Sequence, residues 1–372
     1  MKFTCTRENL SHTLDIVSSV AGRQVNLPIL VNILIIVSES KVEFVATNLE
    51  MSVKANLRAK IEEAGTFTAP AKTLSDYIHL LTEDQVEISL KENELKVSCG
   101  NSSTKIKGTP ADEFPILPEV EASHIYLLLG EPFRQALSQT AIAAAKNEIR
   151  PELSGVNFSF FTERYRGLVL AATDSYRLAE KKVSVAQGED GCNCIVPARA
   201  AYEMARLLGL EKKNDEIQAR VLISNTQLLF QYDNYEFSTR LIDGKYPDYT
   251  QIIPAAFKTT ATFPLEVMIN KIKAASLFTT AGVNAVSFDF NASNNTVGIS
   301  SMSTQKGEHS SEIDADVTGE ENSILLNHRY LLDGLLQMSG DIELLMNSAD
   351  APCLIKEKGK EDYLYIIMPI RQ

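Results

Sequence analysis

The sequence contains two segments of the same pattern, VEFVATNLEMSVKANL at residues 42–57 and GLVLAATDSYRLAEKKV at residues 167–183. Their similarity is the main indication of the fold. Each places an Ala-Thr-Asn/Asp triplet between two apolar segments, and the two triplets lie 126 residues apart. Further on, FTAPAKTLSDYIHLL begins at Phe67 and CIVPARAAYEMARLL begins at Cys194. In both, a proline precedes an apolar pattern of helical period, with a shift of 127 residues. The chain therefore repeats a block of strands followed by a helix.

A third, weaker copy of the block follows. VGISSMSTQKGEHSSEI from Val297 matches the strand hairpin, and SILLNHRYLLDGLLQM from Ser323 matches the second helix. One third of the 372 residues is 124, close to both shifts. A period this long exceeds that of solenoid repeats, so each copy is a domain with its own core. We predict domain 1 at residues 1–124, domain 2 at 125–254 and domain 3 at 255–372.

Periodicity within each copy predicts many strands and two helices. Residues 42–45, 86–90 and 286–290 alternate apolar and polar side chains, as half-buried strands do. The helical segments are 7–21, 72–81, 133–147, 198–209, 265–278 and 328–338. Two helices and many strands in each copy predict an α+β fold in which the two helices of each domain pack on antiparallel sheets. Near the C-terminus, Pro369 within an apolar stretch predicts an edge strand that another part of the chain or a partner covers. A terminal strand that simply completes the third sheet stays open as the alternative.

Composition and charge narrow the classes of function. With 44% hydrophobic and 23% charged residues, the chain is an ordinary globular protein. A net charge of −12 argues against a protein that coats nucleic acid or anionic lipid with its whole surface. The six predicted helices carry +3 in total, so the remaining residues carry −15. If the helices lie together on one surface, that surface could contact the phosphates of a nucleic-acid backbone. If they face solvent separately, their charges are those of ordinary exposed helix faces.

Targeting and metal signals are missing from the sequence. No run reaches the roughly 18 apolar residues of a membrane span, and the N-terminus lacks the hydrophobic region of a secretory signal. Five cysteines, an odd and scattered number, favour a reducing compartment, so we expect a cytoplasmic protein. Cys192 and Cys194 form the one close pair, and no second pair or nearby histidine completes a zinc set. We expect no metal and no cofactor.

Catalytic motifs are also missing. The chain contains no phosphate-binding loop, no dinucleotide fingerprint, no H-E-x-x-H and no G-x-S-x-G. Asp314 and Asp316 are the best carboxylate pair, on one face of a strand, but neither has the apolar flanks that would raise its pKa. We expect a protein that is not an enzyme. An enzyme of unknown class and a three-domain binding scaffold that does not encircle DNA stay open as alternatives.

Five ordered segments carry a resemblance to a known family. They are MKFTCTRENL at 1–10, LPIL at 27–30, ATDSYRLA at 172–179, LIDGKYPDYTQIIP at 241–254 and YIIMPIRQ at 365–372. Together they resemble the bacterial DNA polymerase III β-subunit family, the DNA sliding clamps, along the whole chain. The resemblance implies a head-to-tail homodimer whose six domains form a ring, with helices inside and sheets outside. Such a ring encircles double-stranded DNA without sequence preference and tethers the replicative polymerase for processivity.

The resemblance also implies three sets of site residues. The DNA-binding set is Arg23, Lys72, Lys146, Asn147, Arg150, Arg199 and Arg206. A pocket between domains 2 and 3 accepts short peptides with leucine and phenylalanine from the polymerase III catalytic subunit, the clamp loader, other polymerases and repair proteins. Its residues are Leu153, Thr173, Ser175, Tyr176, Arg177, Leu178, Pro247, Ile252, Asn327, Tyr330, Ile366, Ile367, Met368, Pro369, Ile370 and Arg371. Arg177 and Arg371 are expected to fix the peptide backbone. At the dimer interface, Leu277 and Phe278 are expected to pack near Ile106.

Overall fold

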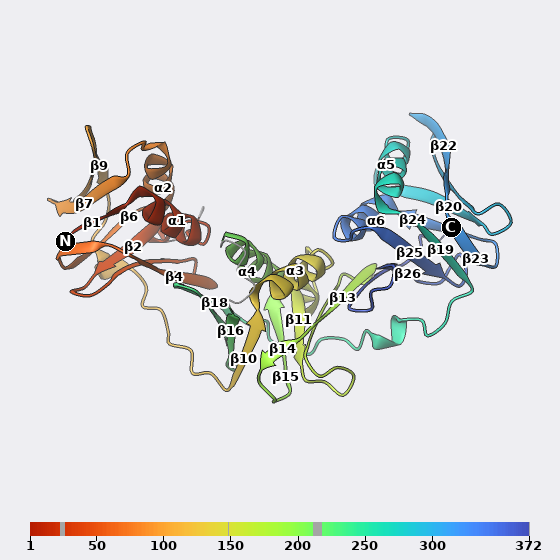
Figure 1. The fold of residues 1–372 in the computed structure, drawn as a ribbon, viewed down its shortest axis with the longest axis horizontal. Helices are drawn as coiled ribbons and strands as arrows, with labels where there is room; N and C mark the ends of the chain where they lie inside the picture. Colours follow the sequence, from red (N-terminus) through yellow and green to blue (C-terminus); the bar gives the residue numbers. More distant parts are fainter. Residues whose placement is uncertain (23–26, 148, 211–217, 372) are drawn as a thin grey trace. The chain divides into compact units, whose positions relative to one another are not determined.

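The computed structural model describes residues 1–22, 27–147, 149–210 and 218–371, and within them the chain forms two compact units (Figure 1). The N-terminal unit comprises Met1–Glu131, Ala186–Gly188 and Arg206–Leu241. The C-terminal unit comprises Pro132–Val185, Glu189–Ala205 and Ile242–Gln372. The strands of the middle repeat are therefore divided between the two units.

Two antiparallel sheets build the N-terminal unit. The five-stranded sheet has the order β5 (Lys60–Glu63), β1 (Lys2–Thr6), β7 (Gln85–Lys91), β8 (Glu94–Cys99) and β9 (Ser102–Lys107). The nine-stranded sheet has the order β14 (Val185–Gln187), β10 (His124–Leu129), β16 (Gln218–Ile223), β17 (Gln227–Tyr232), β18 (Tyr235–Arg240), β4 (Met51–Leu57), β3 (Val42–Thr47), β2 (Asn32–Val37) and β6 (Gly65–Pro70). Pairing of β18 with β4 joins strands of the first and second repeats in one sheet.

Two further antiparallel sheets build the C-terminal unit. Its nine-stranded sheet has the order β15 (Cys192–Pro197), β11 (Gly155–Phe160), β12 (Leu168–Thr173), β13 (Arg177–Val183), β27 (Tyr363–Ile367), β26 (Cys353–Glu357), β25 (Asp341–Met346), β19 (Thr259–Pro264) and β23 (Asp316–Gly319). Its four-stranded sheet has the order β22 (Gly307–Asp314), β21 (Thr296–Ser303), β20 (Ala285–Asn291) and β24 (Asn322–Asn327). Pairing of β13 with β27 joins the second and third repeats.

The described residues form six α-helices, two in each repeat, and the three pairs follow the same plan. The first helix comes directly after a strand in α1 (Arg7–Val17), α3 (Gly130–Ala141) and α5 (Leu265–Ser276). The second helix of each repeat also comes directly after a strand, and these helices are α2 (Ala71–Leu80), α4 (Ala198–Leu210) and α6 (His328–Leu335). Figure 1 shows α1 beside α2 and α5 beside α6, and both pairs are in contact. Three repeated domains of helices on antiparallel sheets, as expected from the sequence, are confirmed.

Local chemistry explains where these helices begin and which face they bury. Thr6 caps α1, its side-chain oxygen accepting a hydrogen bond from the Asn9 N–H at 3.2 Å. In the same way, Asn327 caps α6 by accepting from the Arg329 N–H at 2.9 Å. In α3, Phe133 is buried and packs edge-on against Phe158 of β11, with ring centroids 6.1 Å apart. The apolar stripe of each helix thus meets the sheet beneath it.

The predicted helix at 133–147 is wrong at its end. α3 stops at Ala141, and the Ala143 N–H then donates to the Thr140 oxygen at 3.0 Å, a tighter turn. Ala143 and Ala144 stay buried, so the apolar pattern continues after α-helical bonding has ended. As a result Lys146 lies in a loop, and the six helices carry less positive charge than the sequence predicted.

The C-terminal strand is also not the predicted edge strand. β27 pairs with β13 on one side and with β26 on the other, inside the nine-stranded sheet. Pro369 falls after the strand has ended at Ile367, where its missing N–H costs no ladder hydrogen bond.

Packing of α6 against β27 leaves no room beside Gly334. A Cβ at this position would lie 2.4 Å from ring carbons of Tyr365, a fully buried side chain. We expect Gly334→Ala to lower the melting temperature, because the overpacking cost of about 1–3 kcal/mol offsets any gain in helix propensity. Gly298→Ala is the control, since its Cβ would meet its nearest atom at an ordinary 3.6 Å. Equal melting temperatures for the two variants would contradict this reading of the contact.

Candidate functional site

A cavity of about 870 Å³ opens in the C-terminal unit, on the side of the nine-stranded sheet where α6 lies. Four segments line it: the loop that precedes β11, the turn between β12 and β13, the stretch from the end of α5 to the loop before β20, and α6 with the residues that flank it. Six residues of the predicted peptide pocket line this cavity: Leu153, Ser175, Tyr176, Arg177, Asn327 and Tyr330. The structure therefore gathers residues that are up to 177 positions apart in the sequence.

The turn between β12 and β13 holds its shape through its own side chains. Asp174 Oδ1 accepts hydrogen bonds from the backbone N–H groups of Tyr176 and Arg177, at 3.0 and 3.1 Å. The Thr173 hydroxyl donates to the Arg177 carbonyl at 2.6 Å and accepts from the Ser175 N–H. Ser175 has a φ of 76°, a left-handed conformation that these bonds maintain. The turn presents Tyr176 to solvent as a preorganised group.

Arg177 is the electrostatic centre of the site. Its side chain is only 3% exposed, and its guanidinium forms ion pairs with Asp174 (3.0 Å) and Asp333 (2.6 Å). A further N–H donates to the Tyr365 hydroxyl at 3.4 Å. Burial alone would lower the pKa of Arg177, but Tyr365 and the Asp333 hydrogen bond raise it above its usual value. The guanidinium is therefore permanently charged and already partnered by Asp174 and Asp333. The peptide-fixing role that the resemblance implies for Arg177 stays a prediction.

Two aromatic rings stack outward from Arg177. The guanidinium carbon lies 4.6 Å from the centroid of the Tyr330 ring, a cation–π contact. The Tyr330 ring in turn stacks on Tyr176, with centroids 6.3 Å apart and planes 22° apart. Tyr176 is 63% exposed. Burial raises the pKa of Tyr330, which keeps its hydroxyl protonated. The result is a rigid aromatic column with an exposed apolar face at its outer end.

The C-terminal segment crosses this site after β27 ends. The Met368 N–H donates to the Tyr176 carbonyl, and the Ile370 N–H donates to the Leu325 carbonyl of β24, both at 2.8 Å. These bonds tie the segment to both sheets of the C-terminal unit. Met368, Pro369 and Ile370 are half-buried there, and Arg371 is exposed.

The remaining predicted pocket residues lie deeper or to one side. Thr173, Leu178, Ile366 and Ile367 are buried in the sheet. Ile252 packs on the cluster that contains Leu178 and Ile366. Pro247 lines a separate cavity of about 210 Å³.

Residues of the predicted DNA-binding set are spread over several places. Lys146, Asn147 and Arg150 are exposed and line the large cavity, beside the predicted pocket residues. Arg150 pairs with Glu152 at 3.0 Å. Lys72 on α2 and Arg199 on α4 are exposed. In contrast, the Arg206 guanidinium donates to the Ser19 hydroxyl at 2.6 Å and to the Ile16 carbonyl at 3.3 Å. Arg23 lies outside the described residues.

The predicted interface residues lie near two sheet edges. Ile106 is buried on β9, the last strand of the five-stranded sheet. Leu277 follows α5 directly and is 65% exposed. The Phe278 ring stacks on His309 of β22, with centroids 6.0 Å apart, and β22 is the last strand of the four-stranded sheet. Both strands therefore keep one side free of sheet partners among the described residues.

Sequence reasoning missed Asp174, Asp333 and His328 as site residues. Asp333 lies one helical turn after Tyr330 on α6, a spacing that puts both on one helix face and was the available signal. His328 lines the cavity, and its pKa is lowered mainly by burial and to a smaller extent by the positive charge of Arg329. Asp314 and Asp316, the carboxylate pair weighed above, are both exposed on separate strands. No helix among the described residues is long and apolar enough to cross a membrane.

Residues 1–118, 128–248 and 250–371 match the N-terminal, central and C-terminal domains described as those of the DNA polymerase III beta subunit. A Bacillus subtilis protein named "Beta sliding clamp" is 30% identical over 383 residues, covering 100% of both chains. The crystal structure of the DNA polymerase sliding clamp from Bacillus subtilis aligns with a TM-score of 0.91 at 29% identity, covering 100% of this chain and 99% of that one. The crystal structure of the DNA polymerase III beta subunit from Thermotoga maritima aligns with a TM-score of 0.91 at 26% identity, again covering 100% of this chain and 99% of that one.

Proposed function

The chain belongs to the DNA polymerase III beta subunit family, and from this premise we propose how it acts as a sliding clamp. Two copies associate head to tail into a ring of six domains that encloses double-stranded DNA. Enclosure holds the ring on DNA by topology, so the molecule needs no strong grip on phosphates, which agrees with its net charge of −12. The protein acts by tethering and not by catalysis, and its work on chromosomal DNA places it in the cytoplasm. A scaffold that does not close would stay monomeric, and its mass in solution would distinguish it.

The large cavity is the docking site for partner peptides. Its support is the aromatic column of Tyr176 and Tyr330, which is anchored by the buried Arg177 and exposed at its outer end. A rigid aromatic surface beside a concave pocket that Leu153, Leu332 and Leu336 help to line suits a short peptide with leucine and phenylalanine anchors. The polymerase III catalytic subunit, the clamp loader, other polymerases and repair proteins are the partners that we assign to it.

The two free sheet edges form the subunit interface in this proposal. β9 carries Lys105 and Lys107, whereas β22 carries Glu308, Glu312 and Asp314. Edge strands of opposite charge from two different copies can pair through their free backbone groups. Because the two edges belong to different surfaces, the contact is heterologous, and two such contacts close a dimeric ring.

The DNA-facing surface carries the exposed cations of the predicted set. Lys72, Arg150 and Arg199 are exposed, and Lys146 lies in the loop before Arg150. Arg206 contributes less, because its guanidinium is already bonded to Ser19. Contacts of this kind are to phosphates and carry no base preference.

We expect the double substitution Lys146→Ala and Arg150→Ala to weaken duplex binding and to flatten its salt dependence. Removal of each phosphate contact should lower the slope of log K against log salt by about 0.9. Fluorescence anisotropy with a labelled duplex between about 50 and 200 mM salt measures the slope. Lys258→Ala is the control, since Lys258 is exposed outside the set and pairs with Glu320. A slope that stays the same in the double variant would remove this loop from the DNA surface.

A further inference from the structure

The separate cavity of about 210 Å³ lies on one face of the nine-stranded sheet in the C-terminal unit, and we name it the Glu180 cavity. In the sheet register, Asn157 of β11 pairs with Ala171 of β12, which pairs with Glu180 of β13. Partners in register share one face, so two polar side chains flank a small alanine. Both polar side chains line the hollow of the Glu180 cavity, whereas Ala171 packs in the adjoining core cluster with Leu178 and Ile366.

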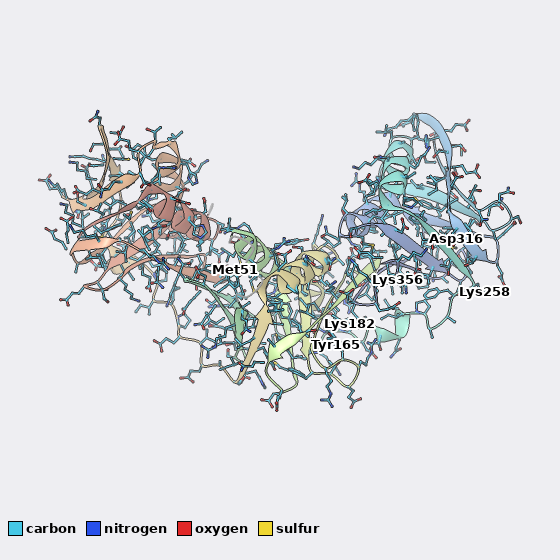
Figure 2. All side chains as sticks on the ribbon, viewed as in Figure 1. Met51, Tyr165, Lys182, Lys258, Asp316 and Lys356 are labelled. Atoms are coloured by element: carbon cyan, nitrogen blue, oxygen red, sulfur yellow. The ribbon has the colours of Figure 1, made fainter. Side chains whose placement is uncertain are left out.

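Two segments wall this hollow. One is Tyr246–Thr250, which leads from the second repeat to the third, and the other is the loop between β11 and β12, with Arg164 and Tyr165. Figure 2 labels Tyr165 and Lys182, which lie near each other and both line the cavity. The Glu180 cavity shares no lining residue with the large cavity described above. The Glu180 cavity is therefore separate from the large cavity.

The floor of the Glu180 cavity holds two buried acceptors without a partner. Asn157 and Asn193 both donate to the Ser159 hydroxyl at 3.0 Å, which leaves Asn157 Oδ1 unpaired among the described residues. The Tyr249 hydroxyl hydrogen-bonds to the Glu180 carboxylate, and Glu180 Oε2 has no partner within the described part of the chain. Asn157 is 4% exposed and Glu180 is 2% exposed. A buried acceptor destabilises the fold unless a donor reaches it.

The mouth of the cavity carries two cationic side chains, Lys182 and Arg164. Lys182 is half-buried and Arg164 is exposed, and neither forms an ion pair with another described residue within 4 Å. Between floor and mouth, the lining includes the rings of Tyr165, Tyr246 and Tyr249 and the polar side chains of Thr162, Asn193 and Thr250. Asp248 also lines the cavity, and its carboxylate already accepts hydrogen bonds from Thr250 and Gln251. Unpaired acceptors at the bottom and cations at the top match a ligand with an ammonium at one end and a carboxylate at the other.

We propose that the Glu180 cavity binds a small zwitterion of free amino-acid size. Its ammonium group donates to Glu180 Oε2 and Asn157 Oδ1, and its carboxylate accepts from Lys182 and Arg164. A volume of about 210 Å³ is below that of the usual drug-sized pocket, so only a ligand of this order of size fits. This site is independent of the clamp function proposed above.

Isothermal titration calorimetry on the full chain tests the proposal with glycine, L-alanine, L-valine and L-leucine as probes. Propylamine and propionate, which carry one charged end each, are titrated in parallel. We expect saturable binding of at least one amino acid and at least tenfold weaker binding of both half-ligands. The proposal is overturned if none of the four amino acids binds, or if propylamine binds as tightly as they do.

Paired variants locate the binding. Glu180→Gln and Lys182→Met should each weaken amino-acid binding at least tenfold, whereas Glu163→Gln and Lys258→Met, exposed residues outside the cavity, should leave it unchanged. If Glu180→Gln lowers the melting temperature below that of the assay, Lys182→Met decides, because its side chain lies at the mouth. Equal binding by Lys182→Met and the parent protein would overturn the assignment. Partner-peptide affinity, measured on the same samples, reports the clamp function separately.

Discussion

Leu277→Ala combined with Phe278→Ala should convert a dimer of about twice 41.1 kDa into a monomer at micromolar concentration. Leu277 is 65% exposed at the end of α5, and Phe278 lies on His309 of the free edge strand β22. In a closed ring, both side chains would be buried against β9 of the second copy. Truncation of two buried anchors costs about 2 kcal/mol each, which raises the dissociation constant several hundredfold or more.

Native mass spectrometry measures this shift directly. Leu80→Ala is the matched control, because Leu80 is a 79% exposed leucine at the end of α2 in the first repeat. We expect the control to stay dimeric and to melt at the same temperature as the parent protein. A double variant that keeps the mass of a dimer would exclude these residues from the interface, and a monomeric parent protein would exclude the ring itself.

Tyr330→Ala should abolish most partner-peptide binding, with affinity lowered about tenfold to a hundredfold. The Tyr330 ring lies between the guanidinium of Arg177 and the exposed ring of Tyr176, so its removal takes away the support of the column. Aromatic anchors in small interfaces typically contribute at least about 2 kcal/mol. Arg177 keeps its ion pairs with Asp174 and Asp333, so the fold should survive.

The measurement is fluorescence polarisation with a labelled short peptide that contains one leucine and one phenylalanine. A peptide in which both are alanine serves as the blank. Tyr77→Ala, a half-buried tyrosine on α2 in the first repeat, is the control variant. Unchanged affinity in Tyr330→Ala would place the peptide site elsewhere, even if the chain still forms a ring.

Several structural features could be predicted because their signals are local. The strands at Val42–Thr47 and Gln85–Lys91 follow from alternating side chains, and the starts of α2 and α4 follow from a strand that ends at a proline. The end of α3 could not be predicted, because buried Ala143 and Ala144 continue the apolar pattern through tighter turns. The edge-strand prediction from Pro369 is wrong because the strand ends at Ile367, two residues before the proline.

The threefold repeat and the helix-on-sheet plan could be predicted from the sequence alone, because repeated segments and the periodicity of apolar side chains are visible in it. The family was indicated separately, by the resemblance of five ordered segments. The burial of Arg177 between Asp174 and Asp333, which is 156 positions away, became visible only in the three-dimensional structure. The same holds for Glu180 and Asn157, which are brought into one cavity by strand register. The physical reason is that burial and ion pairing depend on contacts between distant segments, and these exist only once the sheets have formed.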